Sequence, residues 1–221
     1  MLVLDLKKQY KHLYQPPAGK VQVMDVPELQ FVMIDGAIEP GQEPGTSPGF
    51  TQVIGALYGA ACTLKFALKK RSQDPVDYPV MALEGLWRIE SGEFDMNVKD
   101  NWVYTLMILV PDVVKPDDFA AAVAQLDKKK PNPANARLRL ERFREGLCVQ
   151  ALHIGPYATE PDTLEKMRVF AQANGYRLLH GHHEIYMGDP RQADPSKLKT
   201  VLRYPVESAE GAGIQATVQS P

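Results

Sequence analysis

The chain has 221 residues, 44% of them apolar, which is enough for a compact fold with a sizeable core. Its 25 basic and 27 acidic residues give a net charge of −2, which argues against nucleic acid or an acidic membrane surface as the main partner. No apolar run approaches the roughly 20 residues of a membrane helix, and the N-terminus lacks a signal-peptide pattern, so we predict a cytoplasmic location. Cys62 and Cys148 lack metal-site or redox spacing and are predicted to be reduced core residues.

One order of elements, strand, helix, strand, strand, occurs twice along the chain. A polar N-terminal extension over 1–20 precedes the first copy, which we assign to 21–111. Its predicted elements are, in chain order, a strand at 31–36, a helix with Ser47 as N-cap and Pro48 at its first position, and strands at 78–87 and 103–109.

A helical insertion over 112–146 is predicted to separate the two copies. It contains one helix near 116–129, a proline break, and a second short helix at 136–143. Its lysines and arginines form a local basic cluster. Because this cluster lacks interleaved aromatic residues and is diluted by acidic ones, we interpret it as a solvated connector surface.

The second copy is assigned to 147–206, and a tail at 207–221 is predicted to be poorly ordered. The elements expected in this copy are a strand at 148–154, a helix from about Pro161, and strands at 178–186 and 198–203. We predict a single α+β domain over 21–206, with the two repeats forming a pseudo-twofold antiparallel sheet. Helices are expected on one face and a ligand cleft on the other, since repeat interfaces often hold small-molecule pockets.

The strand pattern at 178–186 carries the polar residues of greatest interest. Alternate residues of a strand share a face, so His182, Glu184 and Tyr186 are predicted to point together into the cleft, while the mostly apolar opposite face meets the helices. A carboxylate recessed among aromatic side chains can serve as the counter-ion of a cationic ligand or as a general base. The alternative is an exposed glutamate on a solvated strand.

Trp87 falls at the place in the first copy that Tyr186 occupies in the second. We therefore expect two aromatic side chains to face each other across the cleft and to offer a stacking surface near Glu184. A structural core tryptophan is the ordinary alternative. Tyr157, next to a Gly-Pro turn, is placed at the cleft rim, where a turn-packing role is equally compatible with the pattern.

His180, His182 and Glu184 share a strand face and are the candidate ligands for a metal ion. The spacing lacks a fourth ligand and matches no established metal motif. We predict neither a metal nor a cofactor. The nucleotide-binding and nucleophile-elbow motifs are also missing from the sequence.

Four segments together resemble the GyrI-like small-molecule-binding family across roughly residues 20–206. They are Phe31-Val-Met-Ile-Asp-Gly36, Leu83-Glu-Gly-Leu-Trp87, His153-Ile-Gly-Pro-Tyr157 and His183-Glu-Ile-Tyr186. The resemblance implies a duplicated fold with a ligand groove on the pseudo-twofold axis. In relatives fused to DNA-binding domains, the groove takes cationic aromatic drugs over a glutamate similar to Glu184.

The Glu-Gly-Leu-Trp segment is similar to a branch of the family that hydrolyses cyclopropane-bearing alkylating natural products. That resemblance implies xenobiotic detoxification, with Glu184 and Tyr186 activating or orienting water. Trp87, Tyr157, His182 and Leu83 would then contact the ligand. The competing expectation is a non-catalytic drug-sequestering, sensor or protein-inhibitor module, for which a protein partner is conceivable but has no support in the sequence.

Overall fold

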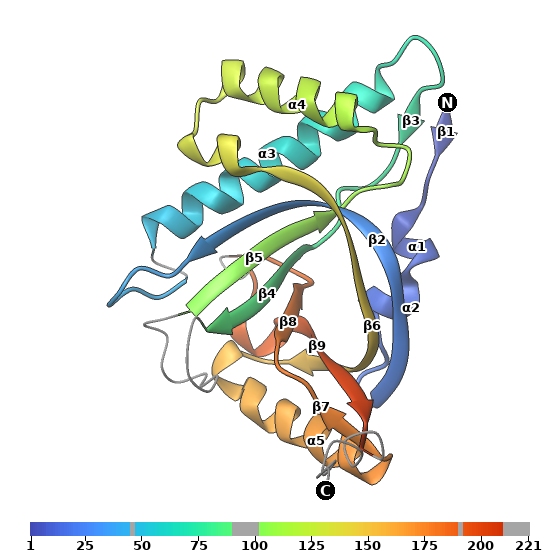
Figure 1. Cartoon of the computed structure of the whole chain (residues 1–221), viewed down its shortest axis with the longest axis vertical. Helices are drawn as coiled ribbons and strands as arrows, with labels where there is room; N and C mark the ends of the chain where they lie inside the picture. The colour runs from blue at the N-terminus through green and yellow to red at the C-terminus, as the bar shows by residue number, and fades with distance from the viewer. Residues whose placement is uncertain (45–46, 90–101, 190–191, 210–221) are drawn as a thin grey trace, which may run out of the picture.

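The computed structural model describes residues 1–44, 47–89, 102–189 and 192–209. Six antiparallel strands close into a barrel in the order β6, β2, β5, β4, β8, β9, and pairing between β9 and β6 completes the circle (Figure 1). The barrel strands are β2 (Val21–Ala37), β4 (Leu83–Ile89), β5 (Trp102–Leu109), β6 (Arg139–Ile154), β8 (His182–Tyr186) and β9 (Lys199–Ser208). A seventh strand, β7 (Tyr176–Leu178), pairs with β9, and β1 (Leu2–Val3) pairs with β3 (Val76–Asp77). The predicted α+β class is confirmed.

Helix α3 (Pro48–Lys69) begins where the sequence predicts it. The Ser47 Oγ accepts a hydrogen bond from the Phe50 backbone N–H at 3.2 Å, and Pro48 occupies the first turn. Apolar residues at three-and-four spacing form its buried face: Val53, Ala56, Leu57, Ala60, Ala61, Leu64 and Leu68. Among the described residues, α3 is the one helix long and apolar enough to cross a membrane, but this face packs against β2 and β5.

The remaining helices lie outside the barrel. Figure 1 shows α4 (Pro116–Lys129) alongside α3 and α5 (Glu160–Ala173) at the other end of the molecule. The short elements are α1 (Leu6–Gln9), α2 (Lys11–Tyr14), and the 3-10 turns η1 (Pro133–Arg137), η2 (Tyr157–Thr159) and η3 (Pro195–Lys197). Met167 and Ala171 of α5 pack with Leu202 of β9, which pairs in register with Glu184.

The predicted helix at 136–143 is wrong, because β6 begins at Arg139 and pairs with β2 along most of its length. The arginines of the basic cluster face acidic residues of β2: Arg139 contacts Asp35 at 2.8 Å, and Arg144 contacts Asp25 at 3.1 Å. These cross-strand pairs favour the extended conformation over a short helix. The basic cluster therefore belongs to a strand with its own counter-charges.

The predicted continuous strand at 178–186 is interrupted. Gly181 has φ +124°, a backbone conformation that L side chains rarely adopt, and the chain turns there between β7 and β8. The predicted tail falls mostly outside the described residues, and β9 itself extends to Ser208.

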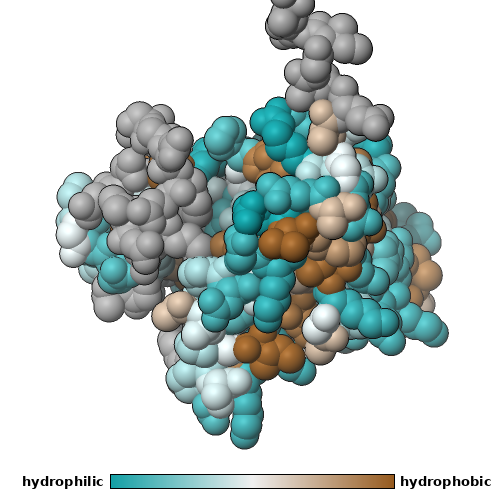
Figure 2. Space-filling model, turned by 90° about the horizontal axis from the view of Figure 1, so that it is seen from below, coloured by the Kyte–Doolittle hydropathy of each residue, from teal (hydrophilic) through white to brown (hydrophobic). Residues whose placement is uncertain are grey.

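The side of the molecule that carries α5 is mostly hydrophilic, with small apolar patches set among polar side chains (Figure 2). Val169 on α5 is one exposed apolar residue of the chain. Such a mixed surface is ordinary for a globular domain.

Candidate functional site

A cavity of about 1490 Å³ lies between α3, the start of α5, and strands β4 and β8. Large apolar and aromatic side chains make up much of its wall: Phe50, Ile54, Tyr58, Leu83, Trp87 and Tyr186. The cavity therefore lies on the same face of the sheet as the helices, whereas the sequence analysis placed it on the opposite face. The reason is barrel closure, since the opposite face of β8 points into the barrel interior.

Glu184 projects from β8 to the cavity wall and is only 7% exposed. Its Oε1 lies 2.5 Å from the His182 Nε2, and the His182 Nδ1 lies 2.6 Å from the Tyr204 hydroxyl. His182 is buried and is not part of the cavity wall, in contrast to the ligand contact expected from the sequence. It instead fixes the orientation of the Glu184 carboxylate.

Trp87 and Tyr186 lie on neighbouring strands and meet at the cavity wall. The Trp87 Nε1–H donates to the Tyr186 hydroxyl oxygen at 2.8 Å. The two side chains are thus joined side by side rather than opposed across the cavity. Gly85 makes this contact possible, because a Cβ at that position would lie 2.8 Å from the Trp87 Nε1.

Trp87 also belongs to an aromatic cluster. Its ring centroid lies 5.8 Å from that of Phe50, 5.4 Å from Trp102 and 5.5 Å from Tyr104. Trp102, which also lines the cavity, was not identified from the sequence, although it directly precedes the strand predicted from 103. The cluster gives the cavity one rigid, apolar side.

Tyr186 stays protonated over the physiological range. Burial raises the pKa of its phenol well above the ordinary value, and the neighbouring Glu184 carboxylate raises it further. The hydroxyl therefore keeps its proton and is a hydrogen-bond donor at the cavity wall, with the Glu184 carboxylate as a neighbouring acceptor.

Tyr157 and Leu83 lie where the sequence analysis placed them, at the cavity. Tyr157 of η2 is 38% exposed, and its ring meets that of Tyr186 at 6.1 Å in an edge-to-face arrangement. Burial, followed by the Glu184 charge, raises the pKa of Tyr157 to about 12. Leu83 sits opposite Tyr186 in the pairing of β4 and β8.

Glu160, the first residue of α5, is a site residue that the sequence analysis missed. It lines the cavity with 0% exposure, and neither carboxylate oxygen has a hydrogen-bond partner among the residues that the structure describes. Burial and the Glu184 charge raise the pKa of Glu160 to about 9; the Thr200 hydroxyl opposes this without reaching hydrogen-bond geometry. Acidic residues are common in the first turn of a helix, so nothing in the local sequence distinguishes Glu160 as a site residue.

Glu160, His182 and Glu184 each place one possible ligand atom within 4.8 Å of the others. Two carboxylates and an imidazole could supply three ligands to a metal ion. However, both ring nitrogens of His182 are already engaged, by Glu184 and Tyr204. We therefore still predict that the protein binds no metal ion.

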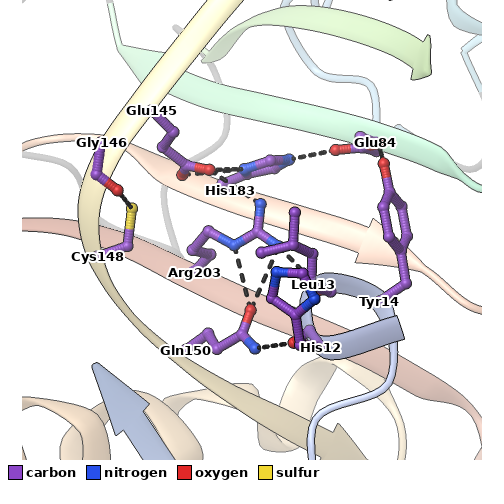
Figure 3. A network of polar contacts seen from close by, with 10 residues as sticks. All are labelled: His12, Leu13, Tyr14, Glu84, Glu145, Gly146, Cys148, Gln150, His183 and Arg203. Carbon is purple, nitrogen blue, oxygen red and sulfur yellow. Dashed lines mark hydrogen bonds and ion pairs between the residues drawn. The ribbon is translucent and has the colours of Figure 1, made fainter. Parts of the chain in front are cut away.

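The opposite face of β8 carries a buried ionic network inside the barrel (Figure 3). His183 lies 3.0 Å from the Glu145 carboxylate and 3.1 Å from that of Glu84, and the Arg203 guanidinium contacts Glu145 at 3.0 Å. Burial alone would lower the pKa of His183, but Glu145 and Glu84 outweigh it and raise this pKa to about 9. His183 is therefore charged in the folded protein at neutral pH.

This network fastens α2 to the barrel. The Arg203 Nη2–H donates to the Leu13 carbonyl at 2.9 Å, the Gln150 side chain donates to the His12 carbonyl at 2.8 Å, and the Tyr14 hydroxyl donates to Glu84 at 2.5 Å. Tyr14 also lines the cavity. The charges of the barrel interior thus hold part of the cavity wall in place.

Comparisons with known proteins match this architecture. The model of the GyrI-like small molecule binding domain matches residues 20–207. An uncharacterized conserved protein from Listeria innocua is 37% identical, with a TM-score of 0.83, and the alignment covers 92% of this chain and 100% of that one. A hydrolase from Listeria innocua is 36% identical, with a TM-score of 0.81 and coverage of 92% and 99%.

A second hydrolase from Listeria innocua is 34% identical, with a TM-score of 0.77 and coverage of 92% of this chain and 100% of that one. A comparison with curated proteins found no match.

Proposed function

The chain belongs to the GyrI-like small-molecule-binding family, and from this premise we propose that its cavity takes aromatic or cationic, largely apolar molecules and hydrolyses those that carry a reactive cyclopropane ring. The observation that carries the proposal is the Glu184 carboxylate, recessed at the cavity wall beside the Tyr186 phenol and the Trp87 ring. The hydrolase names of two Listeria proteins, which are more than 30% identical over most of the chain, support the enzymatic reading.

The chemistry needs one water molecule and two side chains. Glu184 takes a proton from water, and the water oxygen bonds to a ring carbon of the cyclopropane. The strained carbon–carbon bond breaks, and its electron pair moves to the oxygen of a conjugated carbonyl. Tyr186, held as a phenol, donates a hydrogen bond to that oxygen. The oxygen then takes one proton from solvent, and Glu184 releases to solvent the proton that it removed from water, so the carboxylate is restored.

The remaining residues position the reactants. His182 holds one Glu184 oxygen at 2.5 Å, which orients the carboxylate toward the cavity. Trp87 holds the Tyr186 oxygen and presents a ring against which a planar ligand can stack. Leu83 and Tyr157 would contact the ligand at the wall and at the rim.

A second candidate function is sequestration of cationic aromatic molecules without chemistry. The Glu184 carboxylate favours it, since this group lines the cavity and no lysine or arginine among the described residues forms an ion pair with it. A carboxylate near aromatic rings binds an organic cation whether or not water is activated. Either function is proposed to operate in the cytoplasm on a small-molecule ligand.

The deciding experiment incubates the purified protein with a cyclopropane-bearing alkylator that has a conjugated carbonyl, and follows the water adduct by mass spectrometry. We expect Glu184→Gln to lower turnover by about 10²- to 10⁴-fold, as loss of a general base does. Tyr186→Phe removes the hydroxyl that donates to the developing oxyanion and should also slow the reaction. Glu165→Gln, on the exposed surface of α5, is the matched control and should leave turnover unchanged. A protein that forms no adduct from several such electrophiles is a binder, and undiminished turnover in Glu184→Gln would dismiss this residue as the base.

A further inference from the structure

Two carboxyl groups meet at one end of the cavity, where the start of α5 approaches β8. Glu160 is completely buried and Glu184 nearly so, and their oxygens lie within 4.8 Å of each other. The His182 imidazole anchors Glu184, whereas Glu160 has no hydrogen-bond partner among the described residues. Two buried like charges this close strongly favour a state in which one of them is neutralised.

The groups around the pair supply hydroxyls and one imidazole rather than a fixed cation. Tyr186 and His182 face it from β8, Tyr157 from η2, and Tyr204 and Thr200 from β9. Within the described residues, neither Glu160 nor Glu184 has an ion pair with lysine or arginine. The positive charge that balances the pair must therefore come from a proton or from a ligand.

We infer that Glu160 and Glu184 share one proton in the ligand-free protein, and that an organic monocation bound in the cavity takes the place of this proton. Binding of one such cation then releases one proton, with Glu160 as the group that gives it up. This inference deepens the proposed function, on which it rests, because it specifies how the cavity distinguishes a cation from a neutral molecule of the same shape.

The position of Glu160 suits both states. As a neutral acid it lies in an apolar, buried place at little electrostatic cost. As a carboxylate opposite a bound cation, it is stabilised by the cation and by the N-terminus of α5, where the helix dipole favours a negative charge. A neutral ligand offers no such compensation and leaves the proton in place.

The linkage between cation and proton can be measured by titration calorimetry. Tetraphenylphosphonium is a suitable probe because its charge does not depend on pH, and triphenylphosphine oxide is a neutral aromatic control. Measurements at pH 7 in phosphate and in Tris, which differ in ionisation enthalpy, give the number of protons released. We expect about one proton for the cation and none for the neutral molecule, with cation affinity rising about tenfold per pH unit between pH 6 and 8.

Glu160→Gln is the decisive variant, since the amide imitates the protonated acid in shape. It should bind triphenylphosphine oxide like the wild type, which shows that it is folded, but release no proton and lose the pH dependence of cation binding. Glu165→Gln, an exposed change on the same helix, should behave as the wild type.

The outcomes separate this inference from the wider proposal. Cation binding without proton release, or proton release that survives in Glu160→Gln, overturns the exchange but leaves ligand binding intact. Failure to bind any of the probes overturns both. A stoichiometric metal ion found by elemental analysis of the purified protein would also overturn the inference, because the metal rather than a proton would then balance the pair.

Discussion

His183 makes the stability of the fold depend on pH in the neutral-to-alkaline range. Its pKa is about 9 in the folded protein and about 6.5 in an unfolded chain, so the folded state binds an extra proton between these values. The contribution of His183 to the free energy of unfolding is fully present below pH 6.5 and is lost as pH rises toward 9. At about 1.4 kcal/mol per pH unit, the loss from pH 6.5 to 8.5 is about 2 to 3 kcal/mol.

Glu160 causes a second loss of folding stability over the same pH range, for a different reason. Its pKa is about 9 when folded, well above that of an exposed glutamate, so the unfolded chain gains stability by ionising while the folded protein still holds the proton. Its contribution from pH 6.5 to 8.5 has the same sign and a similar size. The wild type should therefore lose stability at about twice the rate expected for one group.

Urea unfolding at several pH values separates the two groups. We expect His183→Gln and Glu160→Gln each to remove about half of the slope. His183→Gln should also be less stable at pH 6.5, by about 3 kcal/mol or more, because Glu145 and Glu84 lose their shared partner. Should that variant unfold too readily, NMR titration of the His183 ring in the wild type gives the same information. A slope that survives in His183→Gln, or a ring that titrates near pH 6.5, would refute the reasoning.

Three further changes test the fold and the cavity. Leu57→Ala removes a fully buried side chain of α3 and should destabilise the protein by about 2 to 5 kcal/mol in urea unfolding, and a loss below 1 kcal/mol would contradict the packing described for that helix. Ser47→Ala removes the N-cap and should cost about 1 kcal/mol by the same assay; no loss would mean that the cap is redundant. In Trp102→Phe the remaining tryptophan is Trp87, and a planar cationic dye should quench its fluorescence on binding; unchanged emission at saturating dye would place the ligand elsewhere.

Local signals in the sequence predicted the elements that depend on local physics. The start of α3 follows from Ser47 and Pro48, and the shared direction of His182, Glu184 and Tyr186 follows from strand alternation. The same alternation could not say that His182 would lie behind the carboxylate rather than in the cavity wall, because that depends on Tyr204 from another strand.

Barrel closure could not be predicted from the sequence for a similar reason. It depends on pairing of β6 with β9, which are separated along the chain by α5, β7 and β8, and on arginines of β6 that form ion pairs with acidic residues of β2. Glu160 was missed because its burial arises only when α5 packs against the barrel beside β8. Both features come from contacts between distant segments, which local patterns do not encode.

Closure of the barrel also separates the parts of the cavity that can vary from those that cannot. Glu184 and Tyr186 sit on β8, whose backbone is hydrogen-bonded to β4 on one side and to β9 on the other, so the floor of the cavity is fixed by the sheet. The walls from α3 and η2 are held by side-chain packing and a few side-chain hydrogen bonds, such as that from the Asn132 Nδ2–H to the Gln52 carbonyl, rather than by strand pairing. Changes at Ile54 or Tyr58 can therefore resize the cavity for a new ligand without moving the reactive carboxylate, which makes α3 the place to alter ligand range by selection or by design.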